Sequence, residues 1–237
     1  MGELERALLY AALAGFAIPL GGLLARVERI SPDWLEVEFR HGVIAFGGGV
    51  LVAAVALVLV PEGIRRLDAL PMLATFGAGG VVFFLVDRLI EKRGGAASQL
   101  MAMIMDFVPE SLALGAMLAT GDAKALLLAG LMALQNLPEG FNAYREIMSN
   151  GRHPSTPLLG AFAALALLGP LAAGLSFLYL RELDAVLGGI MLFASGGILY
   201  LTFQDIGPQT RLERHWAPPL GAIAGFMLGL WGHALVG

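Results

Sequence analysis

Long apolar runs alternate with short polar breaks along this chain. Eight runs can be drawn, each close to the ~20 residues that a helix needs to cross the hydrocarbon core of a bilayer. They cover residues 7–25, 42–61, 70–90, 99–120, 124–147, 156–180, 184–207 and 216–236. The breaks are rich in Arg, Asp, Gly and Pro, which favour helix ends and loops. The pattern predicts an all-α integral membrane protein with eight transmembrane helices, and one transmembrane domain over residues 1–237.

The composition agrees with a membrane location. Of the 237 residues, 57% are hydrophobic and 14% charged, whereas a soluble domain carries roughly 25% charged residues. The 32 glycines suit closely packed membrane helices. The net charge of -4 and the lack of a basic stripe argue against a nucleic-acid partner. The absence of cysteine excludes disulfides and thiolate metal sites.

The distribution of Lys and Arg predicts the orientation, because cytoplasmic loops carry an excess of positive residues. The acidic-leaning start of the chain does not resemble a secretory signal, so we expect the first span to be retained. One side holds Arg26, Arg29, Arg40, Arg88, Lys92, Arg93, Arg145, Arg152, Arg211 and Arg214, and the other Arg6, Arg65, Arg66, Lys124 and Arg181. The excess predicts an inner, plasma-membrane protein of bacterial type with both termini outside the cytoplasm.

Part of the chain repeats at an offset of 147 residues. Spans two and three match spans seven and eight at Phe46 and Phe193, Gly49 and Gly196, Pro61 and Pro208, and Pro71 and Pro218. We therefore predict a 3+2+3 plan in which helices 1–3 and 6–8 are repeats around an unrepeated pair. A repeat of three spans must be inverted in the membrane, an arrangement in which substrate sites form near the midplane.

The unrepeated pair carries two polar clusters. They are Asp106-Phe107-Val108-Pro109-Glu110-Ser111 and Gln135-Asn136-Leu137-Pro138-Glu139-Gly140, whose polar residue, proline and glutamate recur 29 positions apart. Ionisable residues inside a membrane are costly and usually have a partner or a function. Two such clusters in adjacent spans predict one shared site, and a cation is the expected guest.

The spacing within each cluster fits a ligand set. Asp106 and Glu110 share a helix face, as do Gln135 and Glu139, because residues i and i+4 are neighbours on a helix. Each proline also leaves a backbone carbonyl without its helical donor and bends the helix. Three carboxylates close together in low dielectric repel one another, and a divalent cation removes most of that penalty.

Other interpretations of the clusters stay open. The acids could cap helix ends or pair with Arg145. They could serve a carrier of protons or organic cations, an intramembrane metalloenzyme, or a sensing protein without flux. No motif for phosphate binding or a catalytic nucleophile is present, so we do not expect an enzyme.

At these motifs the chain resembles the ZIP (Zrt-, Irt-like) family of divalent-metal transporters, whose fourth and fifth spans carry motifs of the type His-Asn-x-Pro-Glu-Gly. The resemblance also covers the glycine-rich starts of spans two and seven. It implies eight spans, a three-two-three plan, and secondary transport by alternating access. The partners expected are divalent metal ions and the lipid bilayer, with a homodimer left open.

The resemblance also implies which residues bind metal. One position would be lined by Asp106, Glu110, Gln135 and Glu139, with Asp106 where the family usually has histidine. The second position of the family falls here on Phe107, Asn136 and Gly169. Of these only Asn136 could contribute a side-chain ligand, so we expect one strong position rather than two.

The metal itself is left open between two arguments. The family implies zinc-like ions, including cadmium and iron, as the substrate. An oxygen-only ligand set suits manganese as well, although zinc also accepts carboxylates.

Two further groups have alternative roles. Gln204 and Asp205 could line a cytoplasmic exit or lie at a solvated helix end. Four methionines in and near the first cluster are expected to pack against neighbouring helices rather than bind soft metal. They are Met101, Met103, Met105 and Met117.

Overall fold

The computed structural model describes residues 2–28, 33–91, 96–149, 155–180, 182–210 and 216–236. These residues form eight helical rods, one in each predicted span, so the all-α class is confirmed. The rods are α1 (Glu3–Val27); α2, η1 and α3 in series (Asp33–Ala54, Val55–Leu59, Val60–Ile64); α4 (Ala69–Glu91); α5 (Ala96–Ala119); α6 (Lys124–Ser149); α7 and α8 (Ser155–Ala166, Leu168–Tyr179); α9, η2 and α10 (Asp184–Leu201, Thr202–Ile206, Gly207–Gln209); and α11 (Leu220–Val236).

Six of these rods are long and apolar enough to cross a membrane. Among the described residues, α6 and α11 fall outside that group: α11 has 17 residues, and α6 carries the second polar cluster and several charges. Length and composition thus mark a multi-pass membrane protein with six candidate spans, fewer than the eight predicted. Seven of the basic residues that predicted the orientation lie outside the described residues: Arg29, Lys92, Arg93, Arg152, Arg181, Arg211 and Arg214.

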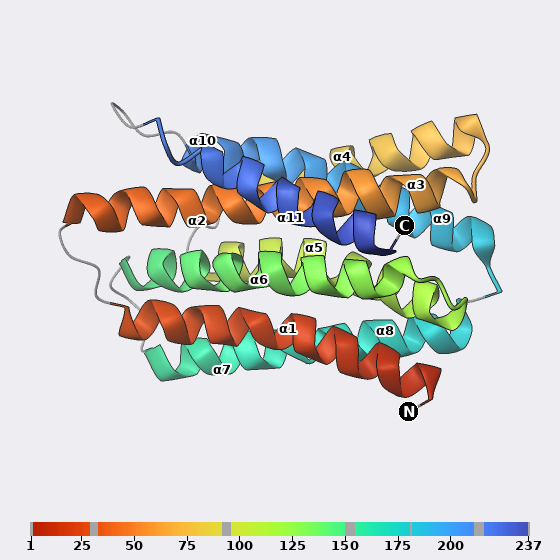
Figure 1. Ribbon diagram of the computed structural model, residues 1–237, viewed down its shortest axis with the longest axis horizontal. Helices are drawn as coiled ribbons and strands as arrows, with labels where there is room; N and C mark the ends of the chain where they lie inside the picture. The colour runs from red at the N-terminus through yellow and green to blue at the C-terminus, as the bar shows by residue number, and fades with distance from the viewer. Residues whose placement is uncertain are drawn as a thin grey trace.

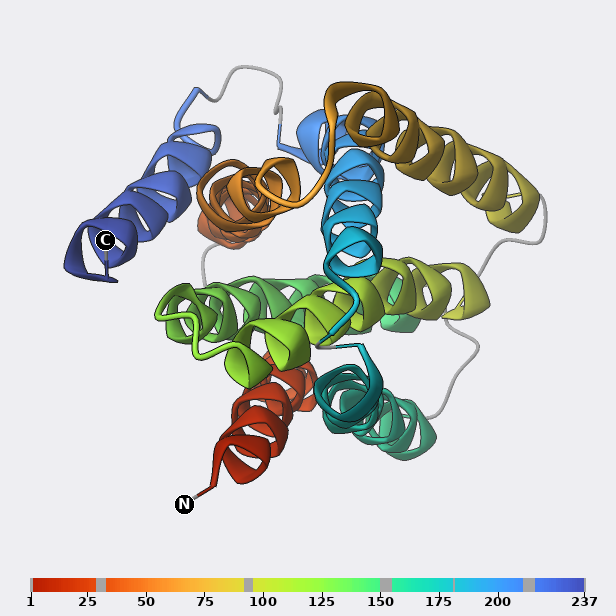
Figure 2. The same cartoon turned by 90° about the vertical axis from the view of Figure 1, so that its right-hand side faces the viewer.

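The rods lie roughly parallel to the long axis, and both ends of the described chain lie at the same end of the bundle (Figure 1). Seen from that end, α5 and α6 form a middle layer (Figure 2). α1 and the α7–α8 rod cover one face of this layer, and α2 and α9 cover the other. α11 packs on the outside of α2, and α4 on the outside of α9. The two helices with the polar clusters are therefore covered on both faces by protein.

The two outer helices are held by matching glycine contacts. On α2, a Cβ at Gly49 would collide with the backbone carbonyl of Ala222 on α11, and Gly225 of α11 meets the carbonyl of Phe46. Small residues at such contacts let helix backbones approach closely in a membrane.

The α9–α4 pair repeats this arrangement. Gly196 lies against the carbonyl of Phe76, and Gly79 lies against the carbonyl of Phe193. Phe193 and Gly196 are the residues that match Phe46 and Gly49 in the sequence repeat. The sequence match therefore corresponds to equivalent packing in three dimensions.

The same two rods contain π-helical turns at corresponding places. η1 covers Val55–Leu59 and η2 covers Thr202–Ile206, again 147 residues apart. Each turn lies just before a matched proline, Pro61 or Pro208. A proline in a regular helix clashes with the carbonyl four residues earlier, and a π turn changes the local register of the hydrogen bonds. We attribute both π turns to these prolines.

A tight turn joins α5 to α6. Gly121 has a φ of 70°, which favours glycine, and its amide bonds to the carbonyl of Leu118 while that of Asp122 bonds to Met117. This is a Schellman closure of α5. Asp122 then accepts a bond from the amide of Lys124 at 2.9 Å, which caps the start of α6. The turn holds the two cluster-bearing helices antiparallel and adjacent.

Candidate metal site

The two polar clusters meet between α5 and α6. Nε2 of Gln135 donates a hydrogen bond to Oε2 of Glu110 at 2.6 Å. Both side chains are buried, as is Asp106. Pro109 and Pro138 lie inside their helices, as the sequence indicated. Glu110 of the first cluster and Gln135 of the second, which were predicted to face each other, are therefore in contact.

A cavity of about 90 Å³ begins beside this contact. Of the predicted ligands, Asp106, Gln135 and Glu139 line it, while Glu110 lies behind Gln135. The remaining walls come from α2, α5, α6, α9, η2 and α10: Ile44, Gly47, Gly48, Leu51, Ala102, Pro138, Asn142, Ile198, Leu201, Asp205, Ile206 and Gln209.

The site is rich in carboxyl groups and in oxygen atoms without partners. Asp106, Glu110 and Glu139 are close enough for their charges to interact. Oδ1 of Asp106 accepts the backbone N–H of Phe107 at 2.8 Å. Oε1 of Glu110 and Oε1 of Gln135 are both buried without a hydrogen-bond partner. Such atoms are costly in an apolar interior, and a bound cation would satisfy them.

The predicted ligands do not converge on one point. In the part of the chain that the structure describes, no group of three or more His, Cys, Asp or Glu side chains is arranged to hold a metal ion. The amide nitrogen of Gln135 faces Glu110, where an amide oxygen would be needed toward a cation. Binding would require this amide to turn and the carboxylates to draw together around the guest.

Asn136 lies elsewhere, against α1. Its Nδ2 donates to the carbonyl of Ala14 at 2.9 Å, and it is not among the cavity-lining residues. The ring of Phe107 fills the neighbouring space, since a Cβ at Gly15 or at Gly169 would collide with it. The three residues that the resemblance assigned to a second metal position thus belong to a packed interface of α1, α5, α6 and α8.

Three cavity residues were absent from the predicted ligand set. Asn142 continues the α6 stripe of Gln135 and Glu139, at the same i+3 and i+4 spacing. Its Nδ2 donates to Oε1 of Gln209 at 3.3 Å. Asp205 also lines the cavity, as its predicted role at an exit from the site required. Gln204 is exposed and does not line this cavity. Extending the α6 stripe by one turn would have found Asn142 from the sequence.

Burial shows which end of the bundle the cavity faces. Asp106 and Gln135 are buried, but Asn142, Asp205 and Gln209 are half-buried. These three residues lie near the end of the bundle where α2 begins and α6 ends. The cavity therefore opens toward that end.

Beyond the acidic site, in the other direction, the faces of α5 and α6 that continue the site are apolar and fully buried. Leu114 and Met117 follow Glu110 on α5, and Leu128 and Met132 precede Gln135 on α6. Val58, Leu59 and Met191 add to this layer from η1 and α9. The layer, which we call the apolar plug, separates the site from the other end of the bundle. Met103 and Met117 are fully buried in the core, as expected of packing residues, and Met101 is exposed.

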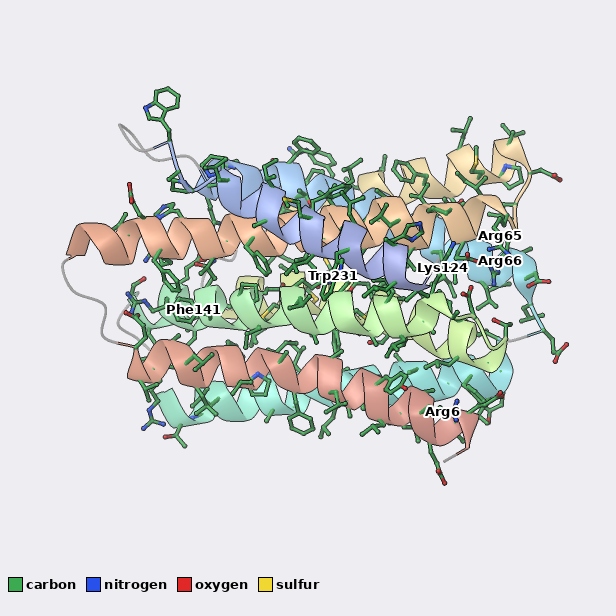
Figure 3. The ribbon with its side chains drawn as sticks, in the orientation of Figure 1. Arg6, Arg65, Arg66, Lys124, Phe141 and Trp231 are labelled. Carbon is green, nitrogen blue, oxygen red and sulfur yellow. The ribbon has the colours of Figure 1, made fainter. Side chains whose placement is uncertain are left out.

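A charged cluster lies past the plug. Glu62 is completely buried and accepts bonds from Arg65 at 2.7 Å, Arg66 at 2.9 Å and Lys124 at 3.3 Å. Figure 3 shows these three cations at one end of the bundle, and Arg6 lies at the same end. All four are described members of the smaller group of basic residues counted from the sequence, and they lie at one end. We call Glu62 and its three partners the Glu62 cluster.

One alternative from the sequence paired the acids of the site with Arg145, whose ion pair in the structure is with Glu28. Nη1 of Arg145 donates to Oε2 of Glu28 on α1 at 2.7 Å, near the opposite end of the bundle from the Glu62 cluster. The carboxylates of the site also lie within their helices rather than at helix ends.

Comparison with known proteins adds no relative: no protein-family model matches this chain, and no curated protein is significantly similar to it in sequence.

Proposed function

We propose that this protein is a secondary transporter of divalent metal ions with the plan of the ZIP family. One observation carries the proposal. Three carboxyl groups and an amide, carried by two adjacent helices that each contain a proline, lie at or beside the buried end of a cavity inside an apolar bundle. Intramembrane acids that face the bundle interior mark ion pathways, and oxygen donors suit hard and borderline divalent cations.

The site would bind one ion through Asp106, Glu110, Gln135 and Glu139. The buried oxygens without partners, on Glu110 and Gln135, would become ligands once the Gln135 amide turned. A divalent charge would offset the mutual repulsion of the carboxylates. Phe107 supports a single position, because its ring fills the space beside Asn136.

Alternating access is proposed for the transport step, with α6 and α11 completing eight spans. The matched glycine contacts and π turns support a 3+2+3 inverted repeat, which allows one end to open as the other closes. By the positive-inside rule, the cavity would open to the cytoplasm and both termini would lie outside it. The membrane proposed is a bacterial-type inner membrane.

Zinc-like ions are the proposed substrates because the motifs resemble those of the ZIP family. Manganese is the alternative because the proposed ligands are all oxygen atoms. No catalytic chemistry is proposed.

Uptake of radioactive zinc and manganese into proteoliposomes tests the function. Removing a direct ligand should lower uptake by more than the ~10–100-fold typical of outer metal-site partners, so Glu110→Ala and Glu139→Ala should both be near background. Glu146→Ala is the matched control, since Glu146 is on α6 but not in the cavity. Flux that persists in both site variants would reject the site.

A proton carrier is the second candidate, supported by the absence of a converged ligand set among the described residues. A pH-sensitive dye inside the same vesicles separates the two. Proton flux without metal would favour that candidate. Metal-dependent flux that rises with pH would favour metal carriage, because carboxylate ligands must be deprotonated to bind.

A further inference from the structure

One stripe of α6 runs the length of the transport path. Lys124, Leu128, Met132, Gln135, Glu139 and Asn142 follow one another at helical i+3 and i+4 spacing. The last three line the cavity, and Leu128 and Met132 belong to the apolar plug. Lys124 is therefore the final residue of the stripe at the closed end.

Lys124 ties α6 to a different part of the bundle. Its Nζ lies 3.3 Å from Oε1 of Glu62, which lies in α3, the last helix of the α2–η1–α3 rod. Arg65 and Arg66 reach Glu62 from its own rod, and Arg66 also lies 3.8 Å from Asp184 at the start of α9. Within the Glu62 cluster, the bond from Lys124 is thus the one that crosses to the helix carrying the site.

The position of the Glu62–Lys124 bond links it to the access of water from the closed end. Water would reach Gln135 from the closed end if α6, which carries Leu128 and Met132 of the plug, moved away from η1. Such a movement would also draw Lys124 from Glu62, because Lys124 is one turn before Leu128 on the same face. We infer that the Glu62–Lys124 bond is a latch that holds this end closed and must break for the site to face it.

Charge favours a latch that can be released without unfolding the rod. When Lys124 leaves, Glu62 keeps the two guanidinium groups of Arg65 and Arg66, so its buried charge is still compensated. Lys124 has a side chain that is 23% exposed, so its ammonium group can be hydrated after separation.

The latch can be tested by cysteine accessibility, since the chain has no cysteine of its own. The latch rests on the proposed function only in that the cavity is taken as part of the transport path. Its test needs no metal. Leu128→Cys reports on the plug and Asn142→Cys on the open end. Each is treated in vesicles with a membrane-impermeant maleimide, applied from either side. With Lys124 present, we expect Leu128→Cys to be protected and Asn142→Cys to react.

Adding Lys124→Gln should raise labelling of Leu128→Cys by about tenfold and lower that of Asn142→Cys, because it shifts a two-state population. Lys124→Arg, which keeps the charge, should restore protection. Arg6→Gln removes a cation at the same end and should change neither reporter. Glu62→Gln provides a second way to remove the bond and should act in the same direction as Lys124→Gln.

Several outcomes would overturn the latch. Unchanged labelling in Lys124→Gln would do so, as would an equal effect from Arg6→Gln. A rise at both reporters would indicate general loosening rather than an exchange of open ends. If wild-type vesicles take up no metal while the labelling exchange occurs, the proposed function fails and the latch stands.

Discussion

The two ends of this bundle are built from matching chain segments, but one end is closed and the cavity opens at the other. The last helix of one rod begins Val60-Pro61-Glu62 and that of the other is Gly207-Pro208-Gln209, each after a π turn. At the first end, Glu62 is completely buried among three cations. At the second, Gln209 is half-buried, accepts a bond from Asn142, and lines the cavity. Equivalent backbone therefore supports both a closed and an open end.

The difference lies in the charge of one residue pair. Charge-assisted hydrogen bonds are roughly twice as strong as neutral ones. The contact at Glu62 joins ions, whereas that at Gln209 joins two neutral amides at 3.3 Å. A passing cation can replace an amide donor more easily than it can replace a buried ion pair. We therefore expect closure at this end to depend on side-chain charge rather than on the backbone, which is equivalent at the two ends.

The largest effect on stability should come from removing the carboxylate at the closed end, because three cations then lose the anion that they share. Glu62→Gln leaves Arg66, whose side chain is 12% exposed, without its carboxylate. Removing one member of a buried ion pair costs about 3–5 kcal/mol, and we expect the lower end of that range because Lys124 and Arg65 reach solvent. At ~2–4 °C per kcal/mol, the thermal unfolding temperature in detergent should fall by roughly 6–12 °C.

Asp184→Asn is the control for that measurement. Asp184 also faces Arg66 but is 79% exposed and 3.8 Å away, so its loss should cost no more than about 1 kcal/mol. Equal shifts for Asp184→Asn and Glu62→Gln would mean that burial of the Glu62 charge does not matter.

The next effect tests whether the two halves are equivalent. Gly49→Ala and Gly196→Ala each drive a methyl group into a backbone carbonyl of the neighbouring helix. Overpacking typically costs about 1–3 kcal/mol, and we expect the two variants to lose similar amounts. Gly77→Ala is the control, because its Cβ would meet nothing within 4 Å. A loss confined to one of the two variants, seen by thermal unfolding, would contradict the equivalence.

The sequence predicted the helices well because each carries a long apolar run between loop residues. It placed the last span too early: α11 begins at Leu220, since Pro218 and Pro219 lie in the preceding turn. It did not predict the break of the sixth span at Leu167, which lies three residues before Pro170. It also predicted no π turns, because these depend on how a particular proline is accommodated within a helix.

The proximity of the two polar clusters was predicted, but the geometry of their contact was not. Spacing on α5 and α6 indicated that Glu110 and Gln135 would be close, and they share a hydrogen bond. Spacing alone could not show that the Gln135 amide would satisfy Glu110, nor that Asn136 would turn to α1. The Glu62 cluster was missed because Glu62 and Lys124 are 62 residues apart and only tertiary packing joins them.

A smaller effect should follow from giving the open end the charge of the closed end. Gln209→Glu adds a carboxylate to the cavity near Asp205, without the cations that neutralise Glu62. Cation affinity rises with the number of charged ligands, so metal should bind about three- to tenfold more tightly, by calorimetry, and be released more slowly. Gln204→Glu is the matched control, since Gln204 is one residue before Asp205 but outside the cavity. Equal tightening by both variants would point to bulk charge instead.

The smallest effect should come from Arg65, the most exposed member of the Glu62 cluster. Its side chain is 66% exposed although its bond to Glu62 is 2.7 Å long, and exposed ion pairs contribute about 0–1 kcal/mol. Arg65→Gln should therefore shift thermal unfolding by only a few degrees at ~2–4 °C per kcal/mol, and less at high salt, where the pair is already screened. Arg66→Gln should cost more, because Arg66 is buried at the same carboxylate. If Arg65→Gln proved as costly as Arg66→Gln, the strength of the closed end would depend on the number of cations around Glu62 and not on their burial.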